Sequence, residues 1–245
     1  LAAMDNALGT DYGLADIPGL DNTGNFPLYL QGTKSNNRYR YGDDGFSMMG
    51  SEVLSFDGVS VGQQDFSALL TTIKSENPDA IFFGGVATEA GLIKRQMDEL
   101  QIKAVFMSDS GILSDTFNKI AGPAAAGTIA HGIGKPLEDL PGGKDFIKAY
   151  QEAKYAEPYE AYAPFAYDAV NIFIQALTQT APERSKLIAA VRGIKDFHGI
   201  LGDTTFDANG QTNLKIITTY ISEDGKWIPY DRSHIKVVNK RIEKQ

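Results

Sequence analysis

Between residues 53 and 131, short continuous apolar runs alternate with longer segments in which apolar residues recur every three or four positions. A short apolar run is typical of a strand buried on both faces of a sheet, and the recurring stripe is typical of a helix with one buried face. Strands that alternate with single helices imply right-handed crossovers and a parallel sheet. We therefore predict an α/β fold, with strands at residues 53–56, 80–83, 104–107 and 127–131.

Two of the predicted helices have recognisable ends. Asp65 can cap the first and Thr88 can cap the second, because their side-chain oxygens can accept from N–H groups of the first turn. Asn77 and Pro78 end the first helix, since the residue before a proline is disfavoured in the helical region. The apolar stripes are Phe66, Leu69, Leu70 and Ile73 in the first helix, and Ile93, Met97 and Leu100 in the second.

After residue 141 the pattern becomes helical and then changes to a β-hairpin. Glu223, Asp224 and Gly225 form a tight turn between a strand at 215–221 and a second strand that begins at Lys226. A hairpin after a helical block suggests a second lobe and a return to the first. The helical stripes lie within residues 146–153, 169–177 and 185–191.

The two ends of the chain have a different composition. The first 48 or so residues are rich in Gly, Asn, Asp and Tyr and show no sustained period, which predicts irregular structure. The segment from His234 to Lys244 is the one basic cluster, and we interpret it as a solvated terminal segment rather than a nucleic-acid patch.

Composition excludes several functional classes. The formal net charge of −8 has the wrong sign for binding a phosphate backbone, so no nucleic-acid partner is expected. There is no apolar run of 18 residues to span a membrane, and no leader pattern, so we expect any export signal to have been removed. Cysteine is absent, which excludes disulfides and thiolate chemistry and fits an oxidising compartment.

The ends of two predicted strands carry a candidate binding site. Ligands of open parallel sheets bind outside the carboxyl ends of the strands. One such end is followed by Gly84, Gly85, Val86, Ala87 and Thr88, and the next by Ser108, Asp109, Ser110 and Gly111. These loops offer backbone N–H groups and hydroxyls for a carboxylate, and Asp109 for an ammonium group. The same residues are also ordinary turn and cap residues.

A catalytic interpretation rests on Ser60. Residues 58–62 match the G-x-S-x-G pattern of a serine hydrolase, and His131 begins a segment that resembles an oxyanion loop. In that fold, however, the oxyanion loop precedes the nucleophile, whereas here it follows. Gln63 and Gln64 also separate the pattern from the predicted helix.

Other cofactor signals are weaker still. The three histidines, His131, His198 and His234, have no metal-site spacing, and neither G-x-G-x-x-G nor the P-loop pattern occurs. Residues 207–210 form a turn rather than a calcium loop, because no bidentate Glu follows at the required distance. No metal or cofactor is therefore expected.

The order of several short motifs resembles the type I periplasmic substrate-binding proteins of ABC transporters, specifically the branched-chain amino-acid-binding (Leu/Ile/Val-binding) family. The resemblance runs from about Tyr41 to about Tyr230. Its motifs are Gln64-Asp-Phe-Ser, Pro78-Asp-Ala-Ile-Phe-Phe-Gly-Gly, Lys94-Arg-Gln, Ile120-Ala-Gly, Ala166-Tyr-Asp-Ala-Val and Thr205-Phe-Asp-Ala-Asn-Gly.

The resemblance implies two α/β lobes with parallel sheets flanked by helices, which close on a solute. It places residues 53–134 and 214–230 in the second lobe, and the helices and turns of residues 135–213 in an incomplete first lobe. Residues 1–52 stay unassigned, and residues 231–245 form a C-terminal tail.

The resemblance also implies positions for the ligand. The family's tyrosine before a glycine matches Tyr41, and its residue after Gly-Gly matches Val86, with Thr88 nearby. Valine there suggests a changed or roomier pocket. The family's ammonium-binding acid falls on Ser110, while the acid here is Asp109, one place earlier. The aromatic residue at the start of the long helix matches Tyr162.

We therefore expect a non-enzymatic, monomeric receptor that captures a small amino acid or related carboxylate and delivers it to the membrane permease of an ABC transporter in the periplasm. The alternatives are the ligand-sensing domain of an amide- or amino-acid-responsive regulator or receptor, and a serine hydrolase that uses Ser60.

Overall fold

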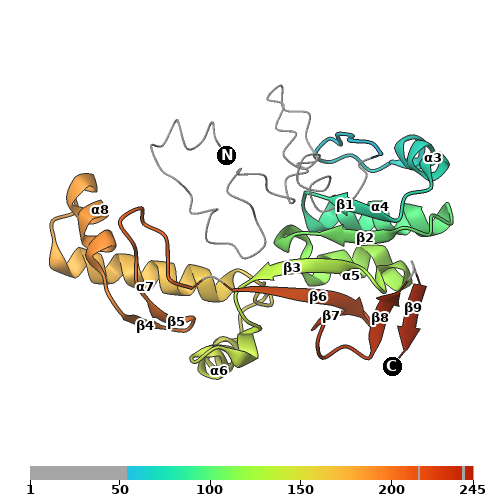
Figure 1. Ribbon diagram of the computed structural model, residues 1–245. Helices are drawn as coiled ribbons and strands as arrows, with labels where there is room; N and C mark the ends of the chain where they lie inside the picture. Colours follow the sequence, from blue (N-terminus) through green and yellow to red (C-terminus); the bar gives the residue numbers. More distant parts are fainter. Residues whose placement is uncertain (1–53, 215, 239–240, 245) are drawn as a thin grey trace. The chain divides into compact units, whose positions relative to one another are not determined.

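The computed structural model describes residues 54–214, 216–238 and 241–244 (Figure 1). These residues form two compact units. Unit 1 contains residues 54–132 and the described residues from Thr219 onward, and unit 2 is Ile133–Thr218. The chain leaves unit 1 at the end of one strand and returns to it within another.

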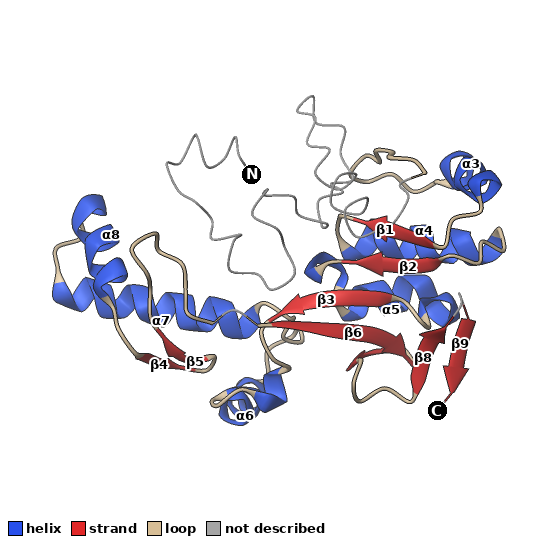
Figure 2. Ribbon diagram, in the orientation of Figure 1, coloured by secondary structure: helices blue, strands red, loops and turns tan. Residues whose placement is uncertain are grey.

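Unit 1 is built on a five-stranded sheet with the order β1-β2-β3-β6-β7. β1 pairs with β2 and β2 pairs with β3 in parallel, whereas β6 and β7 form an antiparallel hairpin. Figure 2 shows the parallel strands side by side with helices along the sheet. The strands are β1 (Ala80–Phe83), β2 (Val105–Ser108), β3 (Ile129–Ile133), β6 (Ile217–Glu223) and β7 (Lys226–Pro229).

Within the described residues of unit 1, three α-helices accompany this sheet, namely α3 (Ser67–Glu76), α4 (Ala87–Glu99) and α5 (Asp115–Ala121). A row of aromatic rings forms the middle of the core: Phe106 stacks with Phe83 and with Phe117, at centroid distances of 6.3 and 6.5 Å. Helices α4 and α5 approach closely at Gly91, where a Cβ would lie 2.8 Å from that of Ile120. The apolar stripes expected for the first two helices face this common core, except for Leu69, which is not part of it.

The turn between β6 and β7 follows the sequence closely. Asp224 and Gly225 have φ values of 49° and 73°, the left-handed geometry that a two-residue hairpin turn requires. Glycine and aspartate tolerate this geometry better than other residues.

Unit 2 is mostly helical. Its helices are α6 (Gly143–Ala153), α7 (Ala163–Gln179) and α8 (Arg184–Gly193), and they are accompanied by a two-stranded sheet, β4 (Phe197–Gly199) with β5 (Gly202–Thr204). Its main apolar cluster is small: Ile172, Ala176 and Ile194 are buried, with partly buried neighbours from α8, from β4 and at Phe206.

Short 3-10 turns complete the described elements. η2 (Ser110–Ile112) follows β2, η3 (Gly122–Ala125) precedes β3, and η4 (Leu137–Asp139) precedes α6. Of these, η2 matters most here, because it begins within the candidate binding site.

Three expectations are corrected. Residues 54–56 form no strand, and the side chains of Leu54 and Phe56 are exposed there. α4 begins after Val86, and Thr88 lies inside its first turn, with no side-chain cap. The basic terminal segment contains a hairpin of β8 (Ile235–Val238) and β9 (Arg241–Lys244).

The side chains at the start of β8 explain why the terminal segment forms a hairpin. Ile235 is buried, and the neighbouring Lys236 turns to Tyr230, whose ring it covers at 4.2 Å. The first three residues of β8, Ile235, Lys236 and Val237, therefore alternate between apolar and charged, as in a half-buried strand. The mixed α/β fold with a parallel sheet flanked by helices is confirmed.

Candidate ligand-binding site

The carboxyl ends of β1 and β2 lie side by side. Phe83 pairs with Ser108 in the parallel register, so both strands end at the same level. The Ser108 hydroxyl is fully buried and donates a 2.7 Å hydrogen bond to the Phe83 carbonyl. This bond fixes the start of one loop relative to the other.

The two loops that follow are packed directly against each other. A Cβ atom on Gly111 would lie 2.2 Å from the carbonyl oxygen of Gly85, and a Cβ on Gly85 would lie 2.5 Å from the ring of Phe83. Real Cβ atoms do not come this close to other atoms, so Gly111 requires glycine unless a loop backbone moves, and a side chain on Gly85 would have to displace the Phe83 ring. The loops therefore form a single surface at the edge of the sheet.

Asp109 occupies the start of this surface and is the cap of η2. Its Oδ1 accepts a 2.8 Å hydrogen bond from the Gly111 N–H, which is the usual action of an N-terminal capping aspartate. The side chain is half-buried. Oδ2 has no hydrogen-bond partner among the described residues, so one oxygen of the carboxylate can accept from another group.

Helix α4 contributes the other side of the surface. Val86 is its N-cap, in extended conformation and 56 % exposed, and it cannot accept a hydrogen bond through its side chain. The first N–H groups of a helix have no partner within the helix, and they favour an anionic group. Thr88, in this first turn, is exposed.

Of the sequence-predicted site residues, the structure brings five together in unit 1: Val86, Thr88, Asp109, Ser110 and Gly111. Tyr162 belongs to unit 2, where it precedes α7 and is exposed. Tyr41 lies outside the described residues.

Sequence reasoning missed the role of Glu89, which lies in the first turn of α4 but is only 6 % exposed. Its Oε1 accepts a 2.8 Å hydrogen bond from the Gly62 N–H, where φ is +80°. Gln96, two turns further along α4, accepts from the Phe66 N–H and donates to the Gln64 carbonyl. These two side chains hold the segment before α3 against α4. A polar residue on a helix is usually solvated, so their burial leaves no signal in the sequence pattern.

His131 lies in β3, one residue beyond the last β2–β3 register pair. Its Nδ1 is 3.2 Å from the Thr219 hydroxyl. Burial lowers the pKa of His131, because the charged imidazolium loses solvation there. The site therefore has no cationic histidine on this strand at neutral pH.

Ser60 is not arranged as a hydrolase nucleophile. No strand leads to it in the described residues, and its backbone N–H donates to the Gln63 side chain within a turn. Within the same residues, none of the three histidines is hydrogen-bonded to Ser60. Their nitrogens lie instead beside Thr219, Asp203 and Glu223.

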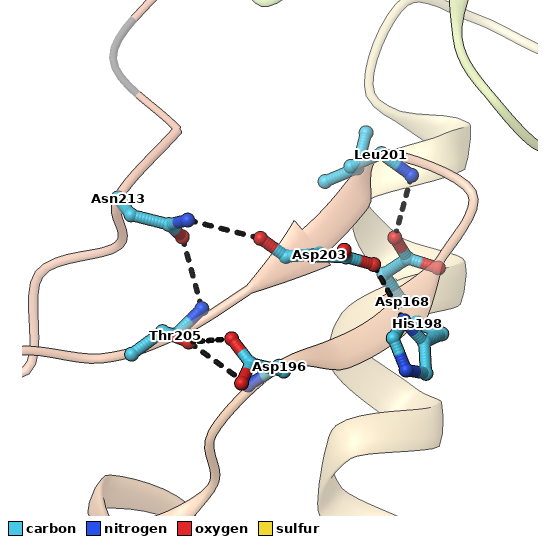
Figure 3. Close-up of polar contacts among 7 residues, drawn as sticks. All are labelled: Asp168, Asp196, His198, Leu201, Asp203, Thr205 and Asn213. Carbon is cyan, nitrogen blue, oxygen red and sulfur yellow. Dashed lines mark hydrogen bonds and ion pairs between the residues drawn. The ribbon is translucent and has the colours of Figure 1, made fainter.

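A second polar cluster, in unit 2, is structural (Figure 3). Asp168 of α7 is 1 % exposed, and its two carboxylate oxygens accept from the N–H groups of Ile200 and Leu201, each at 2.9 Å. It thereby holds the turn between β4 and β5 on α7. A Cβ on Gly199 would lie 2.3 Å from Asp168 Oδ2, so glycine is required there too.

Across the edge of this hairpin, His198 and Asp203 face each other with 2.5 Å between Nδ1 and Oδ1 (Figure 3). Asp203 raises the pKa of His198, first through this hydrogen bond and then through its charge. Both side chains are well exposed, so the pair belongs to the surface.

The described residues contain no cluster of three or more His, Cys, Asp or Glu side chains that could hold a metal ion. They also contain no helix with the length and apolar character needed to cross a bilayer.

The family model described as periplasmic binding protein matches residues 44–226, which is most of the chain. The chain belongs to the periplasmic binding protein family. Its homologues are substrate-binding proteins, which are not enzymes.

Two curated relatives illustrate the similarity. The Leu/Ile/Val-binding protein homolog 2 of Brucella abortus (strain 2308) is 34% identical over 183 residues, which are 73% of this chain and 48% of the relative. The Leu/Ile/Val-binding protein of Escherichia coli (strain K12) is 30% identical over 169 residues, 68% of this chain and 44% of the relative. The chain thus spans about half the length of the curated relatives it matches.

Solved structures agree on the fold. A leucine-binding protein of Thermotoga maritima superposes with a TM-score of 0.68 at 27% identity and covers 77% of this chain and 54% of its own. A branched-chain amino acid transporter substrate-binding protein of Streptococcus pneumoniae, in complex with isoleucine, superposes with a TM-score of 0.67 at 27% identity and the same coverage.

Proposed function

We propose that this chain is part of a solute-binding receptor of an ABC transporter, which captures a small amino acid or a related carboxylate between two lobes. Unit 1 supplies one wall of the site through Val86, Thr88, Asp109, Ser110 and Gly111. Tyr162 of unit 2 and Tyr41 are the remaining proposed ligand contacts.

The single observation that carries the proposal is the joint surface of two loops at the carboxyl ends of β1 and β2. This is the place where open parallel sheets bind ligands. Gly85 and Gly111 are in van der Waals contact there, so polar groups from both loops can meet one small molecule. Membership of a binding-protein family makes a ligand the natural occupant of that surface.

The chemistry of the surface fits a zwitterion. Oδ2 of Asp109, which has no hydrogen-bond partner within the described residues, can accept from an ammonium group. The first-turn N–H groups of α4 can donate to a carboxylate. Val86, at 56 % exposure, can contact an aliphatic side chain. The curated relatives are named for leucine, isoleucine and valine, and these three amino acids are the first ligands to test.

The proposal includes delivery of the ligand to a membrane permease in the periplasm, with the receptor acting as a monomer. The support for transport is the family together with the named transporter role of the Streptococcus pneumoniae neighbour.

The test is a thermal-shift screen of the 245-residue chain against the amino acids and related carboxylates. A ligand at about 100 times its Kd stabilises the folded state by about 2.7 kcal/mol, which raises the melting temperature by several degrees. We expect a shift with at least one aliphatic amino acid. A folded chain that shows no shift with any of these compounds contradicts the proposal.

The role of Asp109 is tested with Asp109→Asn, which retains an oxygen to cap the Gly111 N–H but loses the charge. Affinity for the amino acid should fall by about 1.5–3 kcal/mol, the value of a charged hydrogen bond. Asp115→Asn is the matched control, because Asp115 is an exposed acid in the first turn of α5. Equal affinities of the two variants contradict a contact between Asp109 and the ligand's ammonium group.

A further inference from the structure

Residues 206–212 form a small hairpin in unit 2, closed by an antiparallel bridge between Phe206 and Thr212. Asn209 and Gly210 lie at its exposed tip. Gly210 has a φ of +82°, a conformation that glycine adopts without steric cost. Of the eleven asparagines in the chain, Asn209 alone is followed by glycine. The tip therefore carries a dipeptide with a chemistry of its own.

An Asn-Gly dipeptide can close a succinimide ring. The Gly210 nitrogen attacks Cγ of Asn209, an N–Cγ bond forms, and Nδ2 leaves as ammonia together with the proton of the Gly210 N–H. Water then breaks one of the two carbonyl–nitrogen bonds of the ring, returns a proton to the nitrogen, and leaves aspartate or isoaspartate at position 209. Because glycine has no Cβ, no side chain on residue 210 hinders ring closure. Asparagine is accordingly one of the thermolabile residue types.

The structure holds the two reacting groups differently. The side-chain amide of Asn209 has no hydrogen-bond partner among the described residues, so its Cγ is free to turn toward the main chain. The Gly210 N–H, in contrast, donates to the Asp207 carbonyl at 3.0 Å. Ring closure requires this nitrogen to lose its proton and to turn toward Cγ, and both changes break the hydrogen bond. The native turn therefore restrains the reaction.

Asp207 fixes the geometry of this turn. Its Oδ1 accepts from the N–H groups of Asn209 and Gln211, at 2.9 and 2.8 Å. The negative charge of the carboxylate also disfavours the ionisation of a neighbouring amide N–H. Arg192 of α8 acts in the opposite sense, since its Nε lies 3.8 Å from the place of a Cβ on Gly210. Removal of the Asp207 side chain should thus release the tip and leave the cation in place.

We propose that Asn209 is a site of spontaneous deamidation, and that the turn held by Asp207 sets its rate. In both products a carboxylate replaces a neutral amide within the tip. In the isoaspartyl product the main chain also passes through the former side chain, which adds one methylene group between the paired residues Phe206 and Thr212. The inference does not depend on the proposed ligand, because the hairpin belongs to unit 2 and the loops that follow β1 and β2 belong to unit 1.

Peptide mapping by mass spectrometry tests the proposal, because each product is heavier than asparagine by the difference between a hydroxyl and an amino group. The full chain and a synthetic peptide of residues 204–214 are incubated at mildly alkaline pH and sampled over time. Asp207→Ala is the test variant, since it keeps the main-chain carbonyl and removes the side chain that fixes the turn. Asp203→Ala is the matched control, because the exposed Asp203 side chain contacts His198 instead.

We expect product at Asn209 in the folded chain, and faster product formation in the peptide by about two- to tenfold, the range for opening one hydrogen bond. Asp207→Ala should raise the rate in the folded chain by a similar factor, and Asp203→Ala should leave it unchanged. Asn213 is the internal reference. Its side-chain amide is held at both ends by main-chain groups, so it should stay unmodified.

Amide hydrogen exchange at Gly210 measures the restraint without any substitution. Exchange should be slower in the folded chain than in the peptide, because the N–H must leave the Asp207 carbonyl before it exchanges. This measurement decides the role of the turn even if the Asp207→Ala variant does not fold.

Four outcomes overturn the proposal. Complete conversion of the peptide with no product at Asn209 in the chain means that the folded protein has no such site. Modification of Asn213 at the same rate as Asn209 removes the selectivity. Equal rates in the chain and the peptide, or equal exchange of the Gly210 amide, mean that the turn exerts no restraint. A folded Asp207→Ala variant that reacts no faster than Asp203→Ala removes Asp207 as its cause.

Discussion

The Ser108 hydroxyl donates a 2.7 Å hydrogen bond to the carbonyl of Phe83 and so joins the carboxyl ends of β2 and β1. Ser108 has no exposed surface, and Phe83 is the residue from which the Gly84–Val86 loop departs. One buried side chain thereby holds the two loops of the candidate site at the same level.

Ser108→Ala removes this bond and leaves the Phe83 carbonyl without that donor. We expect the free energy of unfolding to fall by about 1–3 kcal/mol in a urea titration. Ser114→Ala is the matched control, because the buried Ser114 hydroxyl has no hydrogen-bond partner among the described residues. It should change stability by no more than about 0.5 kcal/mol. Equal losses in the two variants contradict a special role for the Ser108 bond.

Gly111→Ala forces a Cβ to within 2.2 Å of the Gly85 carbonyl unless a loop moves. We expect a loss of about 1–3 kcal/mol in stability, as in overpacked cores, together with weaker ligand binding. Gly193→Ala is the control, since no atom lies within 4 Å of a Cβ there and Gly193 ends α8. This control should stabilise the chain by up to about 1 kcal/mol. A stable Gly111→Ala variant with unchanged binding contradicts the loop contact.

Asp168→Asn keeps one acceptor oxygen and turns an amide N–H₂ toward a backbone N–H of the β4–β5 turn. The loss of one charged hydrogen bond should cost about 1.5–3 kcal/mol in a denaturant titration. Asp203→Asn, at an exposed position in the middle of the same hairpin, should cost no more than about 1 kcal/mol. If Asp203→Asn is the more harmful of the two, Asp168 does not anchor the turn.

His198 and His131 should titrate on opposite sides of the ordinary pKa of 6.5. The pKa of His198 is raised by Asp203, so its protonated form favours the folded state below pH 6.5. That contribution is lost as the pH rises through the folded-state pKa. NMR titration of the imidazole signals measures this pKa directly, and Asp203→Asn should lower it. An unchanged midpoint in that variant removes Asp203 as the cause.

The pKa of His131 is lowered by burial, so the unfolded chain binds a proton more readily than the folded one. Stability should therefore decrease as the pH falls below about 6.5 and level off below the folded-state pKa. His131→Gln should remove this part of the pH dependence in urea titrations at a series of pH values. A pH profile identical to that of the unchanged chain contradicts the assignment.

The parallel sheet was predictable because its strands are continuous apolar runs. Residues 80–83 were predicted as a strand and form β1, and the predicted strand at 104–107 differs from β2 by one residue. The start of α3 was predicted to within two residues, because Asp65 does accept from an N–H at the helix start, that of Ser67. Local signals of this kind require no knowledge of distant contacts.

Other features depend on contacts that the local pattern does not contain. Leu54 and Phe56 have the apolar character of a strand but no neighbouring strand in the described residues. Glu89 has the appearance of a solvated helical acid, and only the approach of Gly62 explains its burial. The charge of Asp109 made it a candidate from the sequence. The hydrogen bond that its Oδ1 accepts from the Gly111 N–H depends on how the η2 turn folds, which the sequence pattern does not show.

The most direct test of the proposed site is a two-dimensional ¹⁵N–¹H NMR titration of the chain with the amino acid that gives the largest thermal shift. We predict that the largest changes occur at the backbone amides of Val86, Thr88, Ser110 and Gly111, and that they saturate with a single Kd. Saturable changes confined to other parts of unit 1 or to unit 2, with these amides unmoved, contradict a ligand site at the carboxyl ends of β1 and β2.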